Sequence, residues 1–530
     1  MDAPVVVIGG GVAGLGVALG LSRAGRQVVV VDRDPLTAAA TPDEAFAVDR
    51  KGAPQVRHTH GLLARLTATL RDRFPDVLET LVGAGGVEVD LANRFADRRD
   101  GDADLRVLLA RRTTLEWALR RAAAAEAGVI LRGGVGVESL VGDDTTVRGV
   151  RLSSGELLNA ATVVAAGGRR SGVIGWLAEL GIDVPEEQHE TGIVYLTRWY
   201  RTAGDWDAVI DGDELVKLGG DLGYLFYLAV PADRGTFSLT MAIAAGDASL
   251  RSHLLVSEAF DRAARALPLP PGLVDRLVPD GPVHPMGGLV NRIRRFVDGE
   301  ERPRVIGFHA VGDAHTCTNP IYGRGCSLAL VQAVALTDAM AAHPHDPVAR
   351  AVAYEAACRV QTEPWYRVSV ATDRARQARY RWGEPEGAAT SRAGDREPEG
   401  AASSRAGDRE PEGAASNRAG DSDPDAGPVG AIAELMELGG DDPLVGRAIL
   451  RAVNLLATPD QIMADAAVLT RVMELAQARQ AAKDVAASNA AAGNAGVREQ
   501  AAQDAAAGAP SNPWARHGPT RQEMLDLTAA

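Results

Sequence analysis

The chain has 530 residues, of which 46% are hydrophobic, so it is long and apolar enough for two or three domains. Its formal net charge of −14 disfavours a general nucleic-acid-binding role, because binding to phosphates requires a basic face. The three cysteines lack C-x-x-C spacing, which argues against a zinc site or a disulfide framework and suits a reducing cytoplasm.

The strongest pattern lies near the N-terminus. An apolar run, Val5–Ile8, has the length of a buried strand, and the glycines from Gly9 to Gly14 then match G-x-G-x-x-G. A helix of small residues is predicted from Val12 to about Ala24, followed by a second strand, Val28–Val31, which closes on an acid. This order predicts a Rossmann-like dinucleotide-binding unit.

In such a unit the glycines have separate tasks. Gly9 is expected to make the tight turn, Gly11 to let a pyrophosphate approach the backbone, and Gly14 to let the helix pack close to the sheet. The N–H groups at the helix start, around Val12 and Ala13, are expected to hold the phosphate charge.

Asp32 lies 18 residues after Gly14, close to the spacing expected for a carboxylate that accepts the ribose hydroxyls, and Arg33 follows it in the same predicted half-site. The residues before Val5 lack the positive region of a signal peptide. We expect no integral membrane segment, because no other run of 18 uncharged apolar residues stands out.

A polar loop at 51–63 leads into a helix that is predicted to reach Leu81. His58 and His60 lie in this loop, but no third ligand with suitable spacing is nearby, so a metal site is not predicted. We expect the loop to lie over the cofactor, with Arg57 as a candidate for a positive charge there.

A second predicted helix begins near Arg112, and its Thr113 and Glu116 match the T-x-x-E capping box. The guanidinium of Arg112 can reach a diphosphate from this position. The alternative is a solvated arginine at a helix end.

Short strand runs with hairpin-like turns follow from Val129 to Ala165, and then a helix at Val173–Leu180. Residues 186–280 differ, because three runs rich in aromatic and branched residues predict an antiparallel sheet with one buried face. These runs are Gly192–Tyr200, Tyr224–Val230 and Thr236–Ile243. We assign this sheet to the substrate, with a plain scaffold as the alternative.

A second glycine corner follows the predicted strand Val305–Val311. Gly312 and Asp313 end the strand, and a Pro- and Gly-rich loop leads to a helix at Ser327–Ala341, whose N-terminus favours anions. Asp313 is placed to accept a hydroxyl from a sugar-alcohol chain. The loop Asn319–Gly325 can lay N–H groups against a flat ring through its residues Pro320, Gly323 and Gly325.

Near this corner, simple packing is the expectation for His315, Cys317 and Cys326, because free cysteines are commonly buried. These three residues are therefore not predicted to act on a substrate.

Taken in order, the glycine motif with Asp32, the helix start at Arg112 and the Gly312-Asp313 loop resemble the flavin monooxygenases of the para-hydroxybenzoate hydroxylase fold. Three stretches are similar to the polyether and squalene epoxidase branch: Lys51–His60, Gly192–Arg198 and Gly312–Gly325. The similarity covers roughly residues 5–340, with a weaker helical similarity near 445–475.

The resemblance implies FAD as cofactor and O₂ as co-substrate. It implies that Asp32 binds the adenosine ribose, Arg112 the phosphate or ribityl region and Asp313 the ribityl chain, and that Asn319–Gly325 borders the isoalloxazine.

One stretch departs from the family. Many members that use NAD(P)H themselves carry a D-G sequence after the strand at 163–165, and here Ala166–Arg169 lacks the aspartate. Only one dinucleotide fingerprint is present, so the electron source is either NAD(P)H or a partner flavin reductase.

Helical patterns continue from Val348 to Arg379, and a 13-residue unit then occurs three times between 384 and 422. This unit is too polar to bury a core, so 384–427 is predicted to be a disordered insert. Helices are predicted to resume at Pro428–Glu437, Asp442–Leu456 and Asp460–Arg479. Residues 481–530 are predicted to be a mostly disordered tail with a short helix near its end.

The predicted fold class is α/β, α+β overall. A Rossmann-like FAD-binding domain, formed by 1–185 and 281–345, contains the inserted antiparallel-sheet substrate domain at 186–280, and a C-terminal helical region follows at 346–380 and 428–480.

The predicted function is a cytoplasmic FAD-dependent monooxygenase of secondary metabolism. It would hydroxylate or epoxidise a largely apolar polyketide, terpenoid or aromatic substrate through a flavin C4a-hydroperoxide. Arg57, His58 and Tyr322 are catalytic candidates by position only.

The alternatives are an FAD-dependent reductase or dehydrogenase of an isoprenoid-type double bond and a non-catalytic flavin-binding interaction protein. A halogenase is disfavoured because the sequence lacks Trp-x-Trp-x-Ile-Pro.

Overall fold

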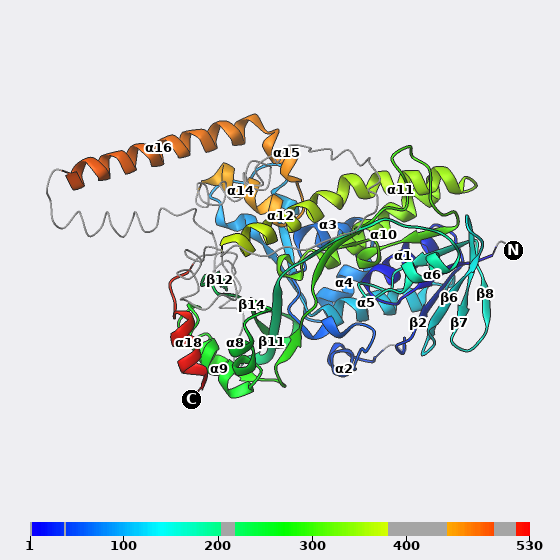
Figure 1. Ribbon diagram of the computed structural model, residues 1–530, viewed down its shortest axis with the longest axis horizontal. Coiled ribbons are helices and arrows are strands. Elements are labelled where there is room, and N and C mark those ends of the chain that lie inside the picture. The colour runs from blue at the N-terminus through cyan, green and yellow to red at the C-terminus, as the bar shows by residue number, and fades with distance from the viewer. Residues whose placement is uncertain (1–2, 37–38, 203–217, 380–441, 492–515, 530) are drawn as a thin grey trace, which may run out of the picture.

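The computed structural model describes residues 3–36, 39–202, 218–379, 442–491 and 516–529 (Figure 1). A parallel sheet lies towards the N-terminus in this view, and an antiparallel sheet lies towards the C-terminus. The 13-residue repeats and the predicted helix Pro428–Glu437 lie outside the described residues.

The parallel sheet has the order β18-β9-β1-β2-β5, and all four pairings are parallel. Its strands, in that order, are Phe308–Ala310, Thr162–Ala165, Val5–Ile8, Val28–Asp32 and Val129–Gly133. Helices cover one face and a small antiparallel sheet covers much of the other, which explains why β1 and β2 are continuous runs of buried apolar residues. The predicted Rossmann-like unit is confirmed.

Helix α1, Val12–Arg23, lies on this sheet between α5, Arg112–Ala125, and α10, Gly325–Ala342. Helix α10 has the length and hydropathy that could cross a membrane, although 72% of that window is buried inside the protein. Its contacts with α1 and with α11, Pro347–Gln361, make it a central helix of the largest core cluster. The N-terminal segment and the chain around residue 325 therefore share one core.

A small, separate antiparallel sheet near residue 150 packs on one face of the parallel sheet (Figure 1). It consists of β6, Val137–Gly142, β7, Val147–Leu152, and β8, Leu157–Asn159, and α6, Val173–Glu179, follows.

The second domain is built on a six-stranded antiparallel sheet, as predicted. Strands β12-β13-β14-β11-β15 lie side by side, and β16 also pairs with β11. Their bounds are Gly219–Asp221, Leu225–Pro231, Thr236–Ala244, Ile193–Thr202, Leu277–Pro279 and, for β16, His284–Met286. Helices α8, Ala248–Leu254, and α9, Ser257–Ala266, pack on this sheet through a core that includes Phe260.

The predicted end of the antiparallel-sheet domain, at residue 280, is too early, because strands after this position still pair with strands before it. Strand β16 joins the six-stranded sheet, and β17, Val290–Arg294, pairs with β10, Glu186–Glu190, and with β19, Thr316–Cys317. This three-stranded sheet connects the two domains.

Three local predictions are wrong. The helix expected to reach Leu81 is two helices, α3, Ala64–Arg73, and α4, Pro75–Gly83, because a proline inside a helix lacks the N–H and clashes with the preceding turn. The strand expected at Val305–Val311 is limited to β18, since Gly307 has a φ of +73°.

The capping box is the third error. Helix α5 already begins at Arg112, and its N-terminus receives no side-chain hydrogen bond from the cap residue Arg111. The side chain of Glu116 instead accepts from two arginines.

Further elements flank these domains. They are α2, Pro42–Ala47; β3, Val87–Asp90; β4, Arg106–Leu109; α12, Glu363–Arg379; α14, Pro443–Val453; α15, Pro459–Met463; α16, Ala466–Ala491; and α18, Arg521–Ala529. Helix α16 projects from the body (Figure 1).

The end of the chain is ordered against the antiparallel sheet, and the short helix predicted near this end is present as α18. The prediction of a mostly disordered tail is wrong for 481–491, which belong to α16, and for 516–529. The side chain of Met524 is fully buried in the core of that sheet. Arg521 forms an ion pair with Asp247, and the Tyr224 hydroxyl donates to the carbonyl of Pro519.

Candidate active site

The two glycine corners predicted from the sequence meet in the structure. A Cβ atom added at Gly312, whose φ is +66°, would lie 3.0 Å from the methyl group of Ala13. The N–H of Gly312 donates to Oε1 of Gln332 over 2.6 Å, which fixes the second corner on α10. Residues about 300 positions apart in the chain, Ala13 and Gly312, thus meet at one edge of the parallel sheet.

Within the first corner, the three motif glycines differ in what surrounds them. A Cβ at Gly9 would lie 2.5 Å from the carbonyl oxygen of Ala166, and a Cβ at Gly14 would lie 1.8 Å from that of Gly9. A Cβ at Gly11 would meet no protein atom closer than 3.8 Å. Gly9 and Gly14 are therefore required by close packing, whereas Gly11 leaves space at the start of α1.

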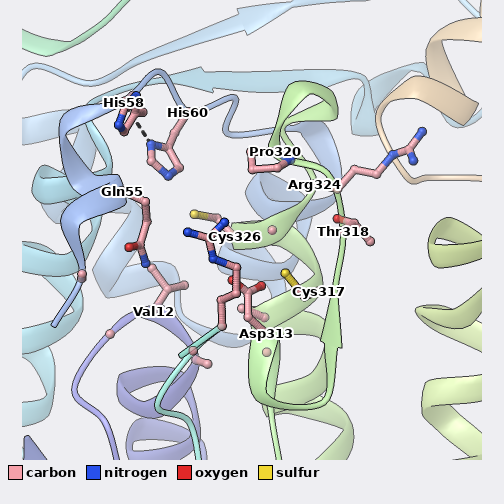
Figure 2. A pocket seen from close by; sticks show the side chains of 18 of the residues that line it. Val12, Gln55, His58, His60, Asp313, Cys317, Thr318, Pro320, Arg324 and Cys326 are labelled. Atoms are coloured by element: carbon pink, nitrogen blue, oxygen red, sulfur yellow. Dashed lines mark hydrogen bonds between the residues drawn. The ribbon is translucent and has the colours of Figure 1, made fainter. Parts of the chain in front are cut away.

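This space belongs to a cavity of about 800 Å³ that runs between the two domains. Of the predicted site residues, fourteen line it: Gly9, Gly11, Val12, Ala13, Asp32, Arg33, His58, Arg112, Gly312, Asp313, Pro320, Tyr322, Gly323 and Gly325. Gly14 and Arg57 do not. Figure 2 shows Val12 and Asp313 at one end of the view and His58 and His60 at the other.

Asp32 has more protein contacts than its predicted role requires. Its carboxylate accepts from the N–H of Gly10 over 2.6 Å and from the N–H of Asp34 over 2.8 Å, and it therefore holds the glycine turn against the end of β2. It also lines the cavity, where its remaining lone pairs can accept hydroxyl groups.

Behind Asp32 lies a buried arginine that the sequence analysis missed. Arg50 donates to Asp34 over 2.9 Å and to Glu116 over 2.7 Å, and lies 3.7 Å from Asp32. Burial opposes the charge of Arg50, yet the surrounding carboxylates raise its pKa above the ordinary value. No motif marks Arg50; the only signal is its place at the start of the polar loop.

Arg112 points into the cavity from the first turn of α5. Its Nε donates to Glu116 over 3.0 Å, and its Nη1 lies 3.2 Å from Nε2 of His60. Because Nδ1 of His60 lies 2.9 Å from the carbonyl oxygen of His58, which only accepts, Nδ1 carries the proton and Nε2 accepts from Arg112. Burial, reinforced by Arg112, lowers the pKa of His60 to about 3, so the ring is neutral.

Asp313 presents a carboxylate to the same cavity. It has no hydrogen-bond partner among the described residues, and burial raises its pKa, although Arg112, Arg169 and Arg292 oppose that rise. Cys317 and Cys326 lie nearby (Figure 2), and burial raises the pKa of Cys326 to about 11, so this thiol is protonated. Asp313 is thus available to accept hydroxyl groups.

His58 ties the polar loop to the antiparallel sheet. Its Nδ1 lies 2.9 Å from the hydroxyl of Thr197, which lies 2.6 Å from that of Thr240. Burial lowers the pKa of His58 to about 3. These contacts place the loop between the two domains, where its residues line the cavity.

Arg57 has a different place from the one predicted. Its guanidinium stacks on Phe46 at 4.9 Å from the ring centroid and donates to carbonyl groups at the end of α2. Its own carbonyl accepts from the indole of Trp199 over 2.8 Å. Arg57 therefore fixes the loop from outside the cavity, which corrects its choice as a catalytic candidate.

At the far end of the cavity, a buried carboxylate on α12 organises the second loop. Asp373 accepts from Nδ2 of Asn291 over 2.7 Å, from Nδ2 of Asn319 over 2.8 Å and from the hydroxyl of Tyr322 over 3.1 Å. The hydroxyl of Tyr195 donates to Oδ1 of Asn319 over 3.0 Å. The sequence analysis missed Asp373, because α12 reads only as a C-terminal helix.

Apart from these polar groups, this end of the cavity is apolar. Its walls come from the antiparallel sheet, the second loop and α12, and include Phe226, Leu228, Met286, Ile321, Val368 and Ala371. An apolar chamber with a few placed polar groups is typical of a small-molecule site.

The other half of the cavity fits the diphosphate, ribose and ribityl groups of FAD. The open space at Gly11, the uncapped start of α1 and the guanidinium of Arg112 suit phosphates. The carboxylates of Asp32 and Asp313 suit hydroxyl groups. The described residues contain no cluster of metal-binding side chains, and the pair His58 and His60 is used in protein contacts.

Comparison with known proteins agrees with this geometry. Residues 4–96 match the family model "FAD dependent oxidoreductase". No curated protein shows significant sequence similarity to the chain.

Solved structures share the fold. The crystal structure of pqsL, a probable FAD-dependent monooxygenase from Pseudomonas aeruginosa, has a TM-score of 0.54 at 18% identity, covering 72% of this chain and 98% of that one. The flavin-dependent brominase Bmp2 gives 0.51 at 17% identity, with 73% and 91% covered. The flavin-dependent halogenase CmlS gives 0.50 at 17% identity, with 70% and 64% covered. The chain thus carries an FAD-dependent oxidoreductase domain in a fold found in flavin monooxygenases and halogenases.

Proposed function

We propose that the protein is an FAD-dependent monooxygenase that hydroxylates or epoxidises a largely apolar organic substrate. One observation carries this proposal: the cavity that joins the two glycine corners continues into an apolar chamber beneath the antiparallel sheet. The motif similarity to the polyether and squalene epoxidase branch supports oxygen transfer, and the sequence lacks the tryptophan motif that would favour halogenation.

In this proposal each group of residues has a defined task. The start of α1 and Arg112 bind the diphosphate, Asp32 binds the ribose, Asp313 binds the ribityl chain, and the loop Asn319–Gly325 supports the ring. When bound and reduced, FAD activates O₂ for transfer of one oxygen atom to the substrate. The apolar walls orient the substrate and exclude water.

We further propose that a partner flavin reductase supplies the electrons. The stretch Ala166–Arg169, where many self-reducing family members carry an aspartate, contains Arg169, which lines the cavity and donates to the carbonyl of Gly288 over 3.2 Å. Stopped-flow mixing of the FAD-loaded protein with NADPH alone is expected to give slow flavin reduction. Fast reduction of the flavin by NADPH alone would contradict the proposal that a partner reductase is needed.

The proposal of a cytoplasmic location is supported by the three cysteines, which are free and buried. Expression of the chain fused to a fluorescent protein in its host tests it by localisation.

Oxygen uptake tests the central proposal. FAD-loaded protein, reduced chemically, is expected to consume O₂ and to convert members of a library of polyketide, terpenoid and aromatic compounds into products that contain one more oxygen atom. Products that gain two hydrogen atoms without O₂ uptake would favour a reductase. A reduced protein that is indifferent to O₂ and to every substrate would favour a flavin-binding interaction protein.

A further inference from the structure

One charged side chain of α12 reaches the apolar chamber. The residues of α12 that line the cavity are spaced along one face of the helix: Trp365, Val368, Ala371, Thr372, Ala375 and Arg376. Among them only Arg376 is charged, and its side chain is 13% exposed. The chamber therefore has a guanidinium near one end of an otherwise apolar wall.

The hydrogen-bonding capacity of this guanidinium is not used up by the protein. Nη1 of Arg376 is buried and has no hydrogen-bond acceptor. The nearest carboxylate oxygen, Oδ1 of Asp373, lies 3.5 Å away, a distance that gives attraction between the charges without a hydrogen bond. Asp221, which also lines the cavity, adds to the negative field around Arg376.

Asp373 cannot easily turn towards Arg376, because its two oxygens already accept from three other side chains. These donors are Asn291, Asn319 and Tyr322. The position of Arg376 is itself constrained by the ring of Tyr322, because its guanidinium lies 5.7 Å from the ring centroid. Arg376 is thus held beside Asp373 and keeps donors for another acceptor.

Two other buried arginines of this chain show how carboxylates neutralise a buried guanidinium by direct hydrogen bonds. Arg50 donates to two carboxylates over 2.7 Å and 2.9 Å. Arg111 also lacks an acceptor for its Nη1, but its Nε and Nη2 make three contacts with the carboxylate of Asp233, between 2.6 Å and 3.2 Å. Arg376 lacks a carboxylate in such a position.

A buried donor without an acceptor destabilises the folded state unless a ligand completes it, and a guanidinium pairs best with an anionic oxygen. We infer that Arg376 binds an anionic oxygen of the substrate, a carboxylate or an acidic phenol or enol, while the apolar body of the substrate fills the chamber. This inference rests on the proposed function and refines its substrate class.

The experiment measures binding to the FAD-loaded protein by isothermal titration calorimetry. The probes are benzoate, 2-naphthoate and decanoate, each paired with its methyl ester, which keeps the body and removes the charge. At least one acid is expected to bind about tenfold more tightly than its ester, the effect of one hydrogen bond to a charged group. Arg376→Gln is expected to abolish that preference and to leave ester binding unchanged.

Arg374→Gln is the matched control, because Arg374 lies on the same helix and is exposed. It is expected to keep the preference for the acid. If Arg376→Gln fails to hold FAD, Arg376→Lys replaces it, since lysine keeps the charge but loses the planar fork, and a threefold or larger loss of acid binding is expected.

The inference is overturned if no acid is preferred by the unaltered protein, or if both Arg376 variants keep the preference. FAD binding and O₂ uptake are measured first on the same preparation. Protein that fails these two measurements contradicts the proposed function, whereas protein that passes them and shows no preference for acids contradicts the role of Arg376 alone.

Discussion

Arg111 and Asp233 form a buried ion pair that joins the two domains. Nη2 of Arg111 lies 2.6 Å from Oδ2 of Asp233, and the backbone N–H of Arg111 donates to Oδ1 over 2.6 Å. Both side chains are almost completely buried, and the hydroxyl of Thr114 donates to the same carboxylate. The N-terminus of α5 is thus fixed to the turn between β13 and β14.

We expect Asp233→Asn to destabilise the protein by about 3–5 kcal/mol, because it removes the buried counter-charge of Arg111 and leaves only the half-exposed Asp43 beside its guanidinium. Urea unfolding measures this loss. Asp43→Asn is the control, since Asp43 also pairs with Arg111 but is 36% exposed, and its loss is expected to stay below about 1 kcal/mol. Equal losses in the two variants would contradict the structural importance of the buried pair.

The glycine motif allows packing and cofactor binding to be separated. Gly14→Ala would place a methyl group 1.8 Å from the carbonyl oxygen of Gly9, so we expect misfolding or a melting temperature lowered by more than about 10 °C. Gly11→Ala meets no protein atom within 3.8 Å and is expected to melt near the unaltered temperature. Its methyl group would occupy the space proposed for the diphosphate.

The affinity of Gly11→Ala for FAD, measured by flavin fluorescence, is therefore expected to be at least about tenfold weaker. A Gly11→Ala protein that binds FAD normally would show that the diphosphate lies elsewhere.

Buried histidines make the stability of the protein depend on pH. In the folded chain, burial lowers the pKa of His58, His60 and His309 to about 3, whereas in the unfolded chain each returns to about 6.5. Between these values the unfolded state binds more protons. The contribution of these histidines to the free energy of unfolding is therefore fully present above pH 6.5. It is lost as the pH decreases towards 3, at about 1.4 kcal/mol per pH unit for each histidine.

Urea unfolding of the FAD-free protein between pH 5.0 and 7.5 checks this slope. His309→Asn removes one of the three groups at a site outside the cavity, and it is expected to reduce the slope below pH 6 by about 1.4 kcal/mol per pH unit. His345→Asn, at an exposed position, is expected to leave the slope unchanged. If His309→Asn keeps the slope of the unaltered protein, the lowered pKa of His309 does not contribute to the pH dependence of stability.

The end of the chain is expected to stabilise the antiparallel-sheet domain. Met524 is fully buried against the antiparallel sheet, so Met524→Ala should cost about 2–5 kcal/mol in unfolding experiments. Leu527, on the same helix, is 42% exposed, and Leu527→Ala should cost less than about 0.5 kcal/mol. If Met524→Ala is as stable as Leu527→Ala, α18 does not contribute to this core.

The sequence predicts well those parts whose backbone needs special residues. Gly9 and Gly14 are required by contacts shorter than a methyl group allows, so their spacing identifies the first βαβ unit. Gly312, with its positive φ, marks the second corner in the same way. The antiparallel sheet is predicted from its long runs of branched and aromatic residues.

Residues whose partners lie far away in the sequence could not be predicted from local sequence patterns. Arg50 pairs with Glu116, 66 residues away, and Asp373 binds Asn291, 82 residues away. Their roles arise only when the sheet order brings these segments together. A short helix near the end of the chain was predicted, but the packing of α18 was missed for a related reason, because its apolar contacts lie on a distant segment of the chain.

The hydroxyl of Tyr224 and the carbonyl of Pro519, which are hydrogen-bonded, are separated by 295 residues. Most of the antiparallel-sheet domain therefore emerges from the ribosome long before α18, which contributes Met524 to the core of that domain, is synthesised. Until then this apolar face of the sheet is uncovered, so nascent chains are expected to need protection by chaperones until α18 has been synthesised.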